Sequence, residues 1–255
     1  MTPLSQIEET THIGYRRIAR SEKASWVRHQ FDAVAARYDL MNTLLSGGIH
    51  YLWKHRAVRL LDLRPGDTVL DVCGGTGDLA VFALQRVLPG GRVVLYDINR
   101  EMMAAGRRKK SHAGLRRKIR FLQGDAEQMA LADNTFDAAV VGFGMRNLTD
   151  MAAGFREMHR VLKPGGRMVC LEFSRPTAPL FRWLYDRYSF HVMPWLGERL
   201  TGSRQAYTYL PESIRLFPAP EALCRLLSDI GFTQVRHWKL TNGIAVIHRG
   251  IKASA

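Results

Sequence analysis

Short apolar runs alternate with segments of helical periodicity through most of the chain. The apolar runs, which predict strands, cover residues 67–73, 92–97, 118–123, 136–142 and 166–173, with two more at 232–238 and 243–249. The helical patterns between the earlier runs cover residues 77–88, 100–111 and 150–162, the last stopped by Pro-Gly-Gly at 164–166. Because strands alternating with helices form a parallel sheet, this order predicts an α/β fold that ends in a β-hairpin.

Two segments lie outside this alternation, and we predict that both belong to one domain spanning residues 1–255. In residues 1–62, apolar side chains at 26, 27, 31, 34 and 35 recur at helical spacing before a turn at 38–42, which predicts a helical N-terminal cap. Residues 174–218 form an aromatic-rich insertion, and insertions at the carboxyl ends of parallel strands sit over the ligand crevice. We therefore expect a helical lid for a large apolar substrate. Its aromatic residues are Phe181, Trp183, Tyr185, Tyr188, Phe190, Trp195, Tyr207 and Tyr209.

A glycine-rich turn follows the first apolar run and opens the first helical pattern. The turn contains Gly75 and Gly77, four and six residues after Asp71. Glycines there let backbone amides and the start of a helix approach a bound molecule. The next strand ends at Asp97, where nucleotide-binding α/β folds place a carboxylate on ribose hydroxyls. These features predict a nucleotide-like ligand.

The chemistry of the turn separates possible ligands. Leu79 and Ala80 stand where a dinucleotide motif needs its third glycine, and Asp78 stands where a P-loop needs lysine. An acidic residue beside the turn would repel a pyrophosphate, whereas a sulfonium cation suits it. S-adenosylmethionine is therefore the predicted cofactor, and the seven predicted strands match the Rossmann-like sheet of class I methyltransferases. A turn that only packs strand against helix is the alternative.

Two later strand ends should face the same ligand. Residues 123–126 place Asp125 and Ala126 where a carboxylate and an amide can meet an adenine. Residues 143–147 place Arg146 and Asn147 over the point of methyl transfer. An arginine beside a sulfonium makes more sense as a partner for a substrate oxyanion than as packing. The alternative is a surface arginine paired with Asp150.

Charge and cysteine content refine this picture. The net charge is +14 with a pI of about 10.2, and basic residues concentrate at 100–120, a predicted surface helix and turn. Such charge favours anionic partners, either nucleic acid or a lipid surface. The three cysteines are too scattered to predict disulfides or a zinc site, which fits reduced core thiols in the cytoplasm. We predict no metal, no signal peptide, and no apolar run of the roughly 18 residues that span a bilayer.

Several longer motifs identify a resemblance that covers residues 10–250. They are Tyr-Asp-Leu-Met-Asn at 38–42, Ser-Gly-Gly-Ile-His at 46–50, Trp-Lys at 53–54, Phe-Gly-Met-Arg-Asn at 143–147, Tyr-Asp-Arg-Tyr-Ser-Phe-His at 185–191 and Tyr-Leu-Pro-Glu-Ser-Ile-Arg at 209–215. With the glycine turn and residues 160–167, they closely resemble the UbiE family of ubiquinone/menaquinone biosynthesis C-methyltransferases. The glycine turn is common to many methyltransferases, whereas the blocks at 38–54 and 185–215 are specific.

The resemblance implies methylation of a ring carbon of a polyprenylated quinol, with S-adenosylmethionine as donor. The acceptor would be 2-demethylmenaquinol, a 2-methoxy-6-polyprenyl-1,4-benzoquinol, or both. The family's cofactor positions fall on Thr76, Asp97, Asp125 and Ala126. The family usually has serine where this chain has Gly142, and often asparagine where it has Asp125.

The mechanism that we predict begins with a quinol hydroxyl that must become phenolate-like before the neighbouring carbon is nucleophilic. Arg146 would stabilise the oxyanion but cannot act as a base, because guanidinium stays protonated. Proton removal falls to a water held by Asn147 and Tyr38, to His50, or to His191. These assignments make Arg146, Asn147 and Tyr38 the predicted catalytic residues.

Rival functions and partners stay open at this point. The basic charge suggests a nucleic-acid methyltransferase, although no catalytic motif of that class is present and we expect no nucleic-acid partner. A small aromatic acceptor and a non-enzymatic protein that only binds S-adenosylmethionine are further alternatives. Basic residues beside an apolar lid predict a cytoplasmic protein in peripheral contact with the inner face of an anionic membrane. A homodimer, or association with other quinone-biosynthesis enzymes, is also compatible.

Overall fold

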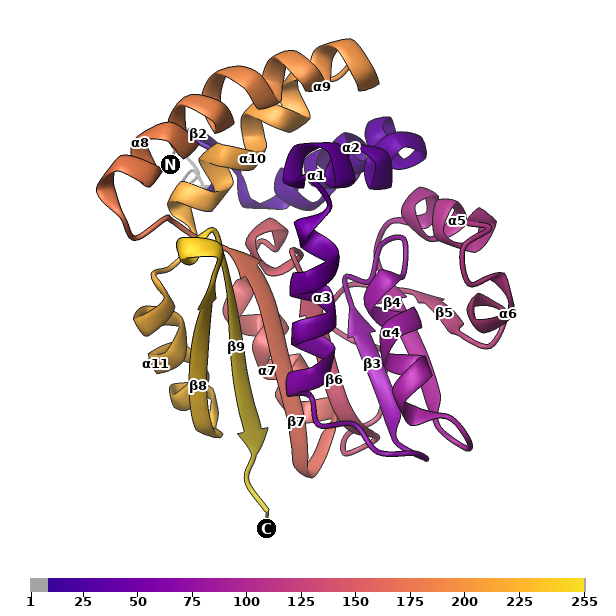
Figure 1. Cartoon of the computed structure of the whole chain (residues 1–255). Helices are drawn as coiled ribbons and strands as arrows, with labels where there is room; N and C mark the ends of the chain where they lie inside the picture. Colours follow the sequence, from indigo (N-terminus) through magenta and orange to yellow (C-terminus); the bar gives the residue numbers. More distant parts are fainter. Residues whose placement is uncertain (1–8, 255) are drawn as a thin grey trace, which may run out of the picture.

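A seven-stranded sheet forms the centre of the molecule, with helices on both faces and a helical layer over one end (Figure 1). This computed structural model describes residues 9–254, so residues 1–8 of the predicted cap and residue 255 of the predicted domain lie outside the described part. The strand order is β5-β4-β3-β6-β7-β9-β8. Strand β9 runs antiparallel to β7 and β8, and the other neighbours pair in parallel. The predicted Rossmann-like fold is confirmed.

The elements follow one another in the predicted alternation. The strands are β1 (Thr10–Ile13), β2 (Arg16–Ala19), β3 (Thr68–Val72), β4 (Arg92–Asp97), β5 (Arg120–Gln123), β6 (Phe136–Gly142), β7 (Leu162–Phe173), β8 (Phe232–Leu240) and β9 (Ala245–Lys252). The α-helices are α1 (Arg20–Val34), α2 (Tyr38–Ser46), α3 (Ile49–Leu60), α4 (Asp78–Val87), α5 (Arg100–Arg108), α6 (Ala113–Arg116), α7 (Met151–Val161), α8 (Pro179–Arg187), α9 (Met193–Thr201), α10 (Arg204–Leu216) and α11 (Pro220–Ile230). Short 3-10 segments are η1 (Ala35–Arg37), η2 (Met145–Asn147) and η4 (Thr241–Gly243), and η3 (Tyr188–Val192) is π-helical.

Local caps explain where the helices beside the sheet begin. The Asn99 side chain accepts a hydrogen bond from the Met102 amide at the start of α5, and the Asp150 side chain caps α7 through the Ala153 amide. The predicted helix over 100–111 is shorter than expected, because the backbone becomes extended at Lys109 and a separate turn, α6, follows. Strand β7 begins at Leu162, so the Pro-Gly-Gly that ends the helical pattern belongs to a strand.

Two apolar layers hold the sheet between its helices. One face packs against α3 and α4 through residues such as Trp53, Leu84 and Val140, and the other packs against α7 and α11 through residues such as Phe155 and Leu223. The chain order reverses between β3 and β6, which are neighbours with β4 on one side and β7 on the other. In open α/β sheets this switch point forms a crevice at the carboxyl ends of the strands.

The N-terminal cap is helical as predicted, with two differences. A two-stranded antiparallel sheet of β1 and β2 precedes α1, and its polar residues gave no strand pattern in the sequence. The predicted turn at 38–42 is instead the first part of helix α2, which ends where Gly47 takes the left-handed conformation, with φ +57°. Helix α1 and the start of α2 contact through the rings of Phe31 and Tyr38.

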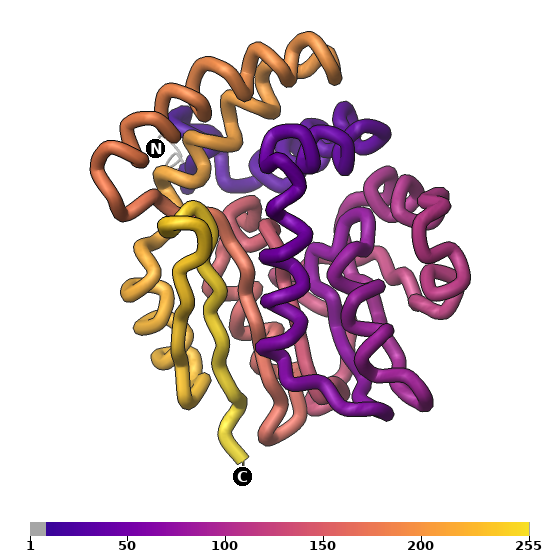
Figure 2. The backbone as a smooth tube through the Cα atoms, viewed as in Figure 1, coloured from indigo at the N-terminus to yellow at the C-terminus, as the bar shows by residue number. Residues whose placement is uncertain are grey.

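The insertion at 174–218, which we call the lid, is helical as predicted. Helices α8 and α9, joined through η3, form one long arm, and α10 runs back beneath it (Figure 2). The arm and the cap helices α1 and α2 lie over the same end of the sheet (Figure 1). Within residues 9–254, no helix combines the length and apolar character needed to cross a bilayer.

Candidate active site

A small cavity of about 90 Å³, which we call the donor cavity, lies at the switch point between β3 and β6. Loops after four strand ends, those of β3, β4, β5 and β6, form its floor, and α1 closes it from the cap. Its walls include Ala24, Val27, Arg28, Phe31, Tyr38, Cys73, Gly75, Asp97, Asn99, Met102, Asp125, Ala126, Gly142, Phe143 and Asn147. The structure therefore brings together the glycine turn and the strand ends that the sequence predicted to face one ligand.

Two backbone amides hold the carboxylate of Asp97 at the donor cavity. Its Oδ2 accepts a hydrogen bond from the Gly75 amide at 2.8 Å, and its Oδ1 accepts one from the Asn99 amide at 2.7 Å. Burial raises the pKa of Asp97 to about 6, against the opposing effect of these two N–H groups. Each carboxylate oxygen can accept a further bond, so the side chain is fixed yet able to bind a ligand.

Glycine is required at two places around this cavity. Gly75 has a φ of +53°, a conformation that side chains disfavour, and this places its amide toward Asp97. A Cβ atom at Gly142 would lie 2.5 Å from Cδ1 of Leu79. In this chain, Leu79 therefore fills the space that a side chain at position 142, such as the family's serine, would need.

The predicted cofactor residues do not all lie on the cavity wall. Asp125 and Ala126 line it, and Oδ1 of Asp125 also accepts a hydrogen bond from the Glu127 amide at 2.8 Å. Among the described residues that line the cavity, neither Thr76 nor Gly77 is found. The Thr76 hydroxyl donates instead to Oδ1 of Asp39 at 2.7 Å.

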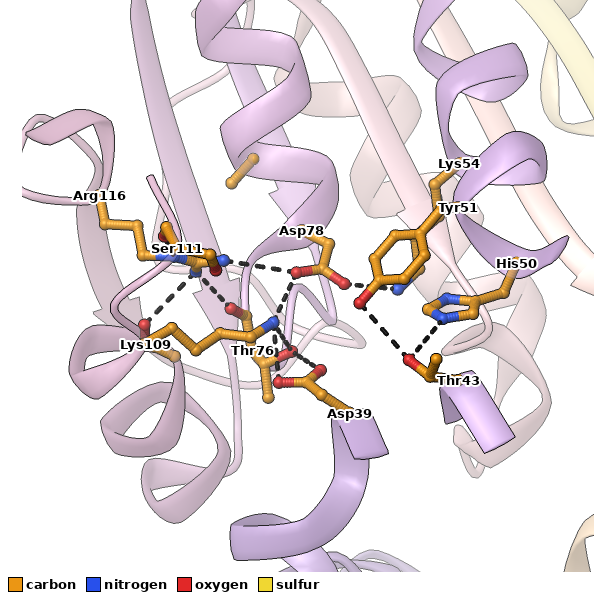
Figure 3. A network of polar contacts seen from close by, with 12 residues as sticks. Asp39, Thr43, His50, Tyr51, Lys54, Thr76, Asp78, Lys109, Ser111 and Arg116 are labelled. Atoms are coloured by element: carbon orange, nitrogen blue, oxygen red, sulfur yellow. Dashed lines mark hydrogen bonds and ion pairs between the residues drawn. The ribbon is translucent and has the colours of Figure 1, made fainter. Parts of the chain in front are cut away.

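The turn is connected to the cap by a buried ionic network centred on Asp78 (Figure 3). The Asp78 carboxylate contacts Nζ of Lys54 at 2.8 Å, Nζ of Lys109 at 2.5 Å and Nη2 of Arg116 at 3.4 Å. Lys109 also pairs with Asp39 of α2 at 2.7 Å. The network joins α2, α3, α4, α6 and the end of α5.

This network corrects the prediction that the basic segment 100–120 is entirely surface. Arg116 is only 4% exposed, and its Nη1 donates to the carbonyl of Thr76 at 2.7 Å. Burial alone would raise the pKa of Asp78, but Lys54 and Lys109 outweigh it and hold that pKa well below its usual range. Two of the basic residues therefore hold the glycine turn rather than an external partner.

A second, larger cavity of about 330 Å³, which we call the acceptor cavity, lies between the cap, the lid and the end of the sheet. Its walls are mainly apolar and aromatic, and they include Val34, Leu45, Ile49, His50, Trp53, Arg146, Phe173, Tyr185, Tyr188, Met193, Tyr207, Tyr209 and Ile244. Phe31, Tyr38 and Phe143 line both cavities, so these three side chains form a shared wall. The aromatic residues of the lid divide accordingly: the tyrosines face the acceptor cavity, and Trp183 and Trp195 face outward.

Arg146 places a buried cation in the acceptor cavity. It pairs with Glu172 at the end of β7, with 3.0 Å between Nη1 and Oε2, and Nη1 also donates to the Phe143 carbonyl. The alternative partner, Asp150, pairs with Arg20 and Arg156 instead, so that interpretation of Arg146 is wrong.

Glu172 leaves part of the guanidinium uncommitted. Within residues 9–254, Nε of Arg146 is buried without a hydrogen-bond partner. Burial alone would lower the pKa of Arg146, but Glu172 raises it, so the side chain stays cationic. Glu172 was not predicted from sequence, although a glutamate inside the apolar run 166–173 is itself a signal of a buried charge pair.

The other predicted catalytic residues lie around Arg146. Asn147 lines the donor cavity and accepts, on Oδ1, a hydrogen bond from the Tyr209 hydroxyl at 3.0 Å. Tyr38 stands at the shared wall. Burial raises the pKa of Tyr209 to about 12, so its hydroxyl stays protonated and donates. Tyr209 therefore ties the lid to the loop that carries Arg146 and Asn147.

The two histidines considered as bases differ in position. His50 is buried on the acceptor cavity wall, with Nε2 at 3.3 Å from the Thr43 hydroxyl. Burial and, secondly, Lys54 lower the pKa of His50 to about 4, so it is neutral near pH 7. His191 is exposed, its Nδ1 lies 3.2 Å from the Arg187 carbonyl, and it lines neither cavity among the described residues.

Solved structures share the fold of this chain. A S-adenosylmethionine-dependent methyltransferase from Aquifex aeolicus superposes with a TM-score of 0.60, 19% identity, and coverage of 84% of this chain and 97% of that one. The [4+2]-cyclase SpnF superposes with a TM-score of 0.65 at 16% identity, over 90% of this chain and 96% of that one. At these identities the likeness concerns the fold, which is that of class I methyltransferases.

Sequence relatives identify the family. The model of the ubiE/COQ5 methyltransferase family matches residues 18–252. A protein of Pseudomonas fluorescens named ubiquinone/menaquinone biosynthesis C-methyltransferase UbiE is 47% identical over 248 residues, which cover 97% of each chain. The chain belongs to the ubiE/COQ5 methyltransferase family and is an S-adenosylmethionine-dependent C-methyltransferase.

Proposed function

We propose that this enzyme methylates a ring carbon of a polyprenylated quinol, as the names of its relatives suggest. The observation that carries the proposal is an apolar cavity containing a buried arginine with an uncommitted donor, Nε of Arg146, next to the donor cavity. Only a thin wall of Phe31, Tyr38 and Phe143 divides the two cavities. An apolar molecule with one oxyanion and a long tail matches this arrangement.

The donor cavity has the chemistry that S-adenosylmethionine needs. Asp97, already oriented by two amides, would accept hydrogen bonds from ribose hydroxyls, and Asp125 with the Ala126 amide would meet the adenine. Gly75 leaves the part of the turn that lines the cavity free of a side chain, and the Thr76 hydroxyl anchors the same turn to Asp39 of the cap. When bound, the cofactor supplies a methyl carbon attached to a positively charged sulfur, which suits an acidic cavity.

Arg146 has the central role on the acceptor side. A cationic guanidinium beside a quinol hydroxyl lowers the pKa of that hydroxyl and stabilises the oxyanion. The neighbouring ring carbon becomes more nucleophilic, and it loses its hydrogen as a proton once it carries the methyl group. Glu172 positions Arg146, because it accepts from both the guanidinium and the Arg146 backbone amide. The apolar walls exclude water around this charge.

Proton removal is better assigned to the Tyr38–Asn147 side than to the histidines. Nε2 of His50 lies 3.3 Å from the Thr43 hydroxyl, and His50 lines the acceptor cavity but not the donor cavity among the described residues, so we assign it to hydrogen bonding. Asn147 lines the donor cavity and Tyr38 lines both cavities, so the two can hold a water near the reacting hydroxyl.

The outer face of the lid arm has the character of a membrane-docking surface. Leu180, Trp183, Leu184, Val192 and Trp195 are 40–73% exposed along α8, η3 and α9. Arginine guanidinium groups lie over the two tryptophan rings, at 5.5 Å from the Trp183 ring and 4.9 Å from the Trp195 ring. Exposed tryptophans with arginines are typical of helices that lie at an anionic lipid interface. This face would deliver the polyprenyl substrate to the cavity below it, and a nucleic-acid partner is not required to explain the basic charge.

The function is tested by assaying the purified enzyme with methyl-labelled S-adenosylmethionine. Demethylmenaquinol and a methoxy-polyprenyl benzoquinol are offered in detergent, and an RNA and a DNA duplex serve as competing acceptors. We expect label in one or both quinols and none in nucleic acid. Label in nucleic acid, or in neither quinol under conditions where the protein binds S-adenosylmethionine, would overturn the proposal.

The membrane surface is tested by liposome flotation with and without anionic lipid. The double change Trp183→Ser and Trp195→Ser should lower binding to anionic liposomes. Leu52→Ser, at an apolar position on α3 that is more exposed than either tryptophan, should not. If the double tryptophan variant floated with anionic liposomes as fully as Leu52→Ser, the lid arm would not be the docking surface.

A further inference from the structure

Three side chains with metal-binding atoms meet on the sheet face covered by α11, away from both cavities. Cys224 lies on α11, and His237 and His248 are directly opposite each other on the paired strands β8 and β9. Their candidate ligand atoms all lie within 4.8 Å of one another. His248 is four residues along the chain from Ile244 of the acceptor cavity, about 13 Å of extended strand.

His248 is prepared as a ligand by its hydrogen bonding. Its side chain is 2% exposed, and Nε2 lies 3.1 Å from the Pro220 carbonyl. Because a carbonyl only accepts, Nε2 carries the proton and Nδ1 carries the lone pair. Within the described part of the chain, that Nδ1 is buried without a hydrogen-bond partner. A histidine that binds a metal usually has this pattern, with its other ring nitrogen donating to a carbonyl or carboxylate.

His237 and Cys224 complete the set with matching geometry. Nδ1 of His237 lies 3.4 Å from Sγ of Cys224, and Nε2 of His237 lies 3.7 Å from Oε1 of Glu221. Tetrahedral zinc with bonds of about 2.0 Å to nitrogen and 2.3 Å to sulfur separates neighbouring ligand atoms by about 3.3–3.6 Å. The sulfur–nitrogen pair already has this separation, and the Glu221 carboxylate stands where it can orient the second imidazole.

We propose that Cys224, His237 and His248 form a binding site for one Zn²⁺ ion. One thiolate and two imidazoles are the ligand types that zinc prefers, and the half-buried positions of Cys224 and His237 leave a fourth coordination position open to water. Spacing in the sequence did not predict this site, because the three residues are brought together by α11 packing on β8 and β9. A bound ion would fasten α11 to the final hairpin without taking part in methyl transfer.

The test uses the full chain, stripped of metal with a chelator and titrated with Co²⁺ alone. Tetrahedral Co²⁺ gives visible absorption bands and a near-ultraviolet thiolate-to-cobalt band, and Zn²⁺ then bleaches both. We expect saturation at one equivalent. Cys224→Ser should remove the thiolate band, and His237→Gln should weaken Co²⁺ binding by more than about tenfold.

His29→Gln, which changes an exposed histidine on α1, is the matched control and should bind like the unaltered chain. Cys224 and His237 are only half-buried, and circular dichroism verifies that their variants fold. Failure of the unaltered chain to give a saturable thiolate band would overturn the proposal, as would the same band in Cys224→Ser or unchanged affinity in folded His237→Gln. None of these measurements depends on the methylation reaction.

Discussion

The donor and acceptor cavities share a wall but are built from different parts of the chain. Loops at the ends of β3, β4, β5 and β6 form most of the donor cavity, and backbone amides orient its central carboxylate, Asp97. Cap and lid helices form most of the acceptor cavity, and side chains such as Arg146 and Tyr209 supply its polar groups. The central carboxylate of the donor cavity thus comes from the sheet, whereas most walls of the acceptor cavity come from segments added to the sheet.

If this division holds, side-chain changes outside α1, which borders both cavities, should alter the measurements for one cavity and leave those for the other intact. The largest effect is expected from Arg146→Ala, which removes the donor for the oxyanion. We predict a fall in kcat of about 10²- to 10³-fold, with the Kd for S-adenosylmethionine unchanged because Arg146 does not line the donor cavity.

Arg156→Ala, which alters an exposed arginine paired with Asp150, should keep full activity. Arg146→Ala leaves Glu172 buried without its partner, so thermal unfolding of this variant should be recorded to verify that it folds. Arg146→Lys is a second variant, which retains a positive charge beside Glu172. Turnover by Arg146→Ala within a few-fold of the unaltered enzyme would refute the oxyanion assignment.

The donor side is tested by Asp97→Asn. Loss of a charged acceptor for hydroxyl groups costs about 1.5–3 kcal/mol, so the Kd for S-adenosylmethionine in calorimetry should increase by about 10- to 100-fold. Asp133→Asn, at a 65% exposed carboxylate, is the control and should have no effect. An unchanged Kd in Asp97→Asn would mean that Asp97 only holds the turn.

The same residue predicts a pH dependence. Burial raises the pKa of Asp97 to about 6, and the ligand's hydroxyl groups favour the ionised form. S-adenosylmethionine affinity should therefore be nearly constant above about pH 7, decline through pH 6, and fall by about 10- to 100-fold in total as the carboxylate becomes protonated. In Asp97→Asn the decline should disappear, and its persistence there would assign the titration to another group.

The smallest effect on activity is expected from removing the hydrogen bond between Tyr209 of the lid and Asn147. Tyr209→Phe removes one hydroxyl–amide hydrogen bond to Asn147, worth about 0.5–1.5 kcal/mol, so kcat/KM for the quinol should fall about two- to tenfold. Tyr15→Phe, at a tyrosine that is 57% exposed, should leave kcat/KM unchanged. If Tyr209→Phe altered the Kd for S-adenosylmethionine as strongly as kcat/KM, the two cavities would not be separable.

The contrast between the cavities also explains what could be predicted from sequence. Strand β4 and the turn at Gly75 were predicted because periodicity and glycine spacing are local signals. The Arg146–Glu172 pair joins residues 26 positions apart, and Asp78 meets Lys54 and Lys109 at separations of 24 and 31.

No spacing rule in the sequence predicts such partners, because the packing of strands and helices decides which residues become neighbours.

The β1–β2 hairpin was missed for a different reason. Its residues are mostly polar and exposed, so it lacks the alternation that marks a strand packed on a core. The single-domain organisation and the oligomeric state stay predictions.

Helix α1 supplies side chains to both cavities: Val27 and Arg28 face the donor side, Gln30 and Val34 face the acceptor side, and Phe31 borders both. The donor cavity, at about 90 Å³, is well below the roughly 300 Å³ at which small-molecule sites begin. Binding of the methyl donor should therefore displace α1. The α1 side chains that line the acceptor cavity would move with the helix. Reciprocity then requires each substrate to change the other's affinity by the same factor. The methyl donor and the quinol would then be coupled through one helix that borders both sites.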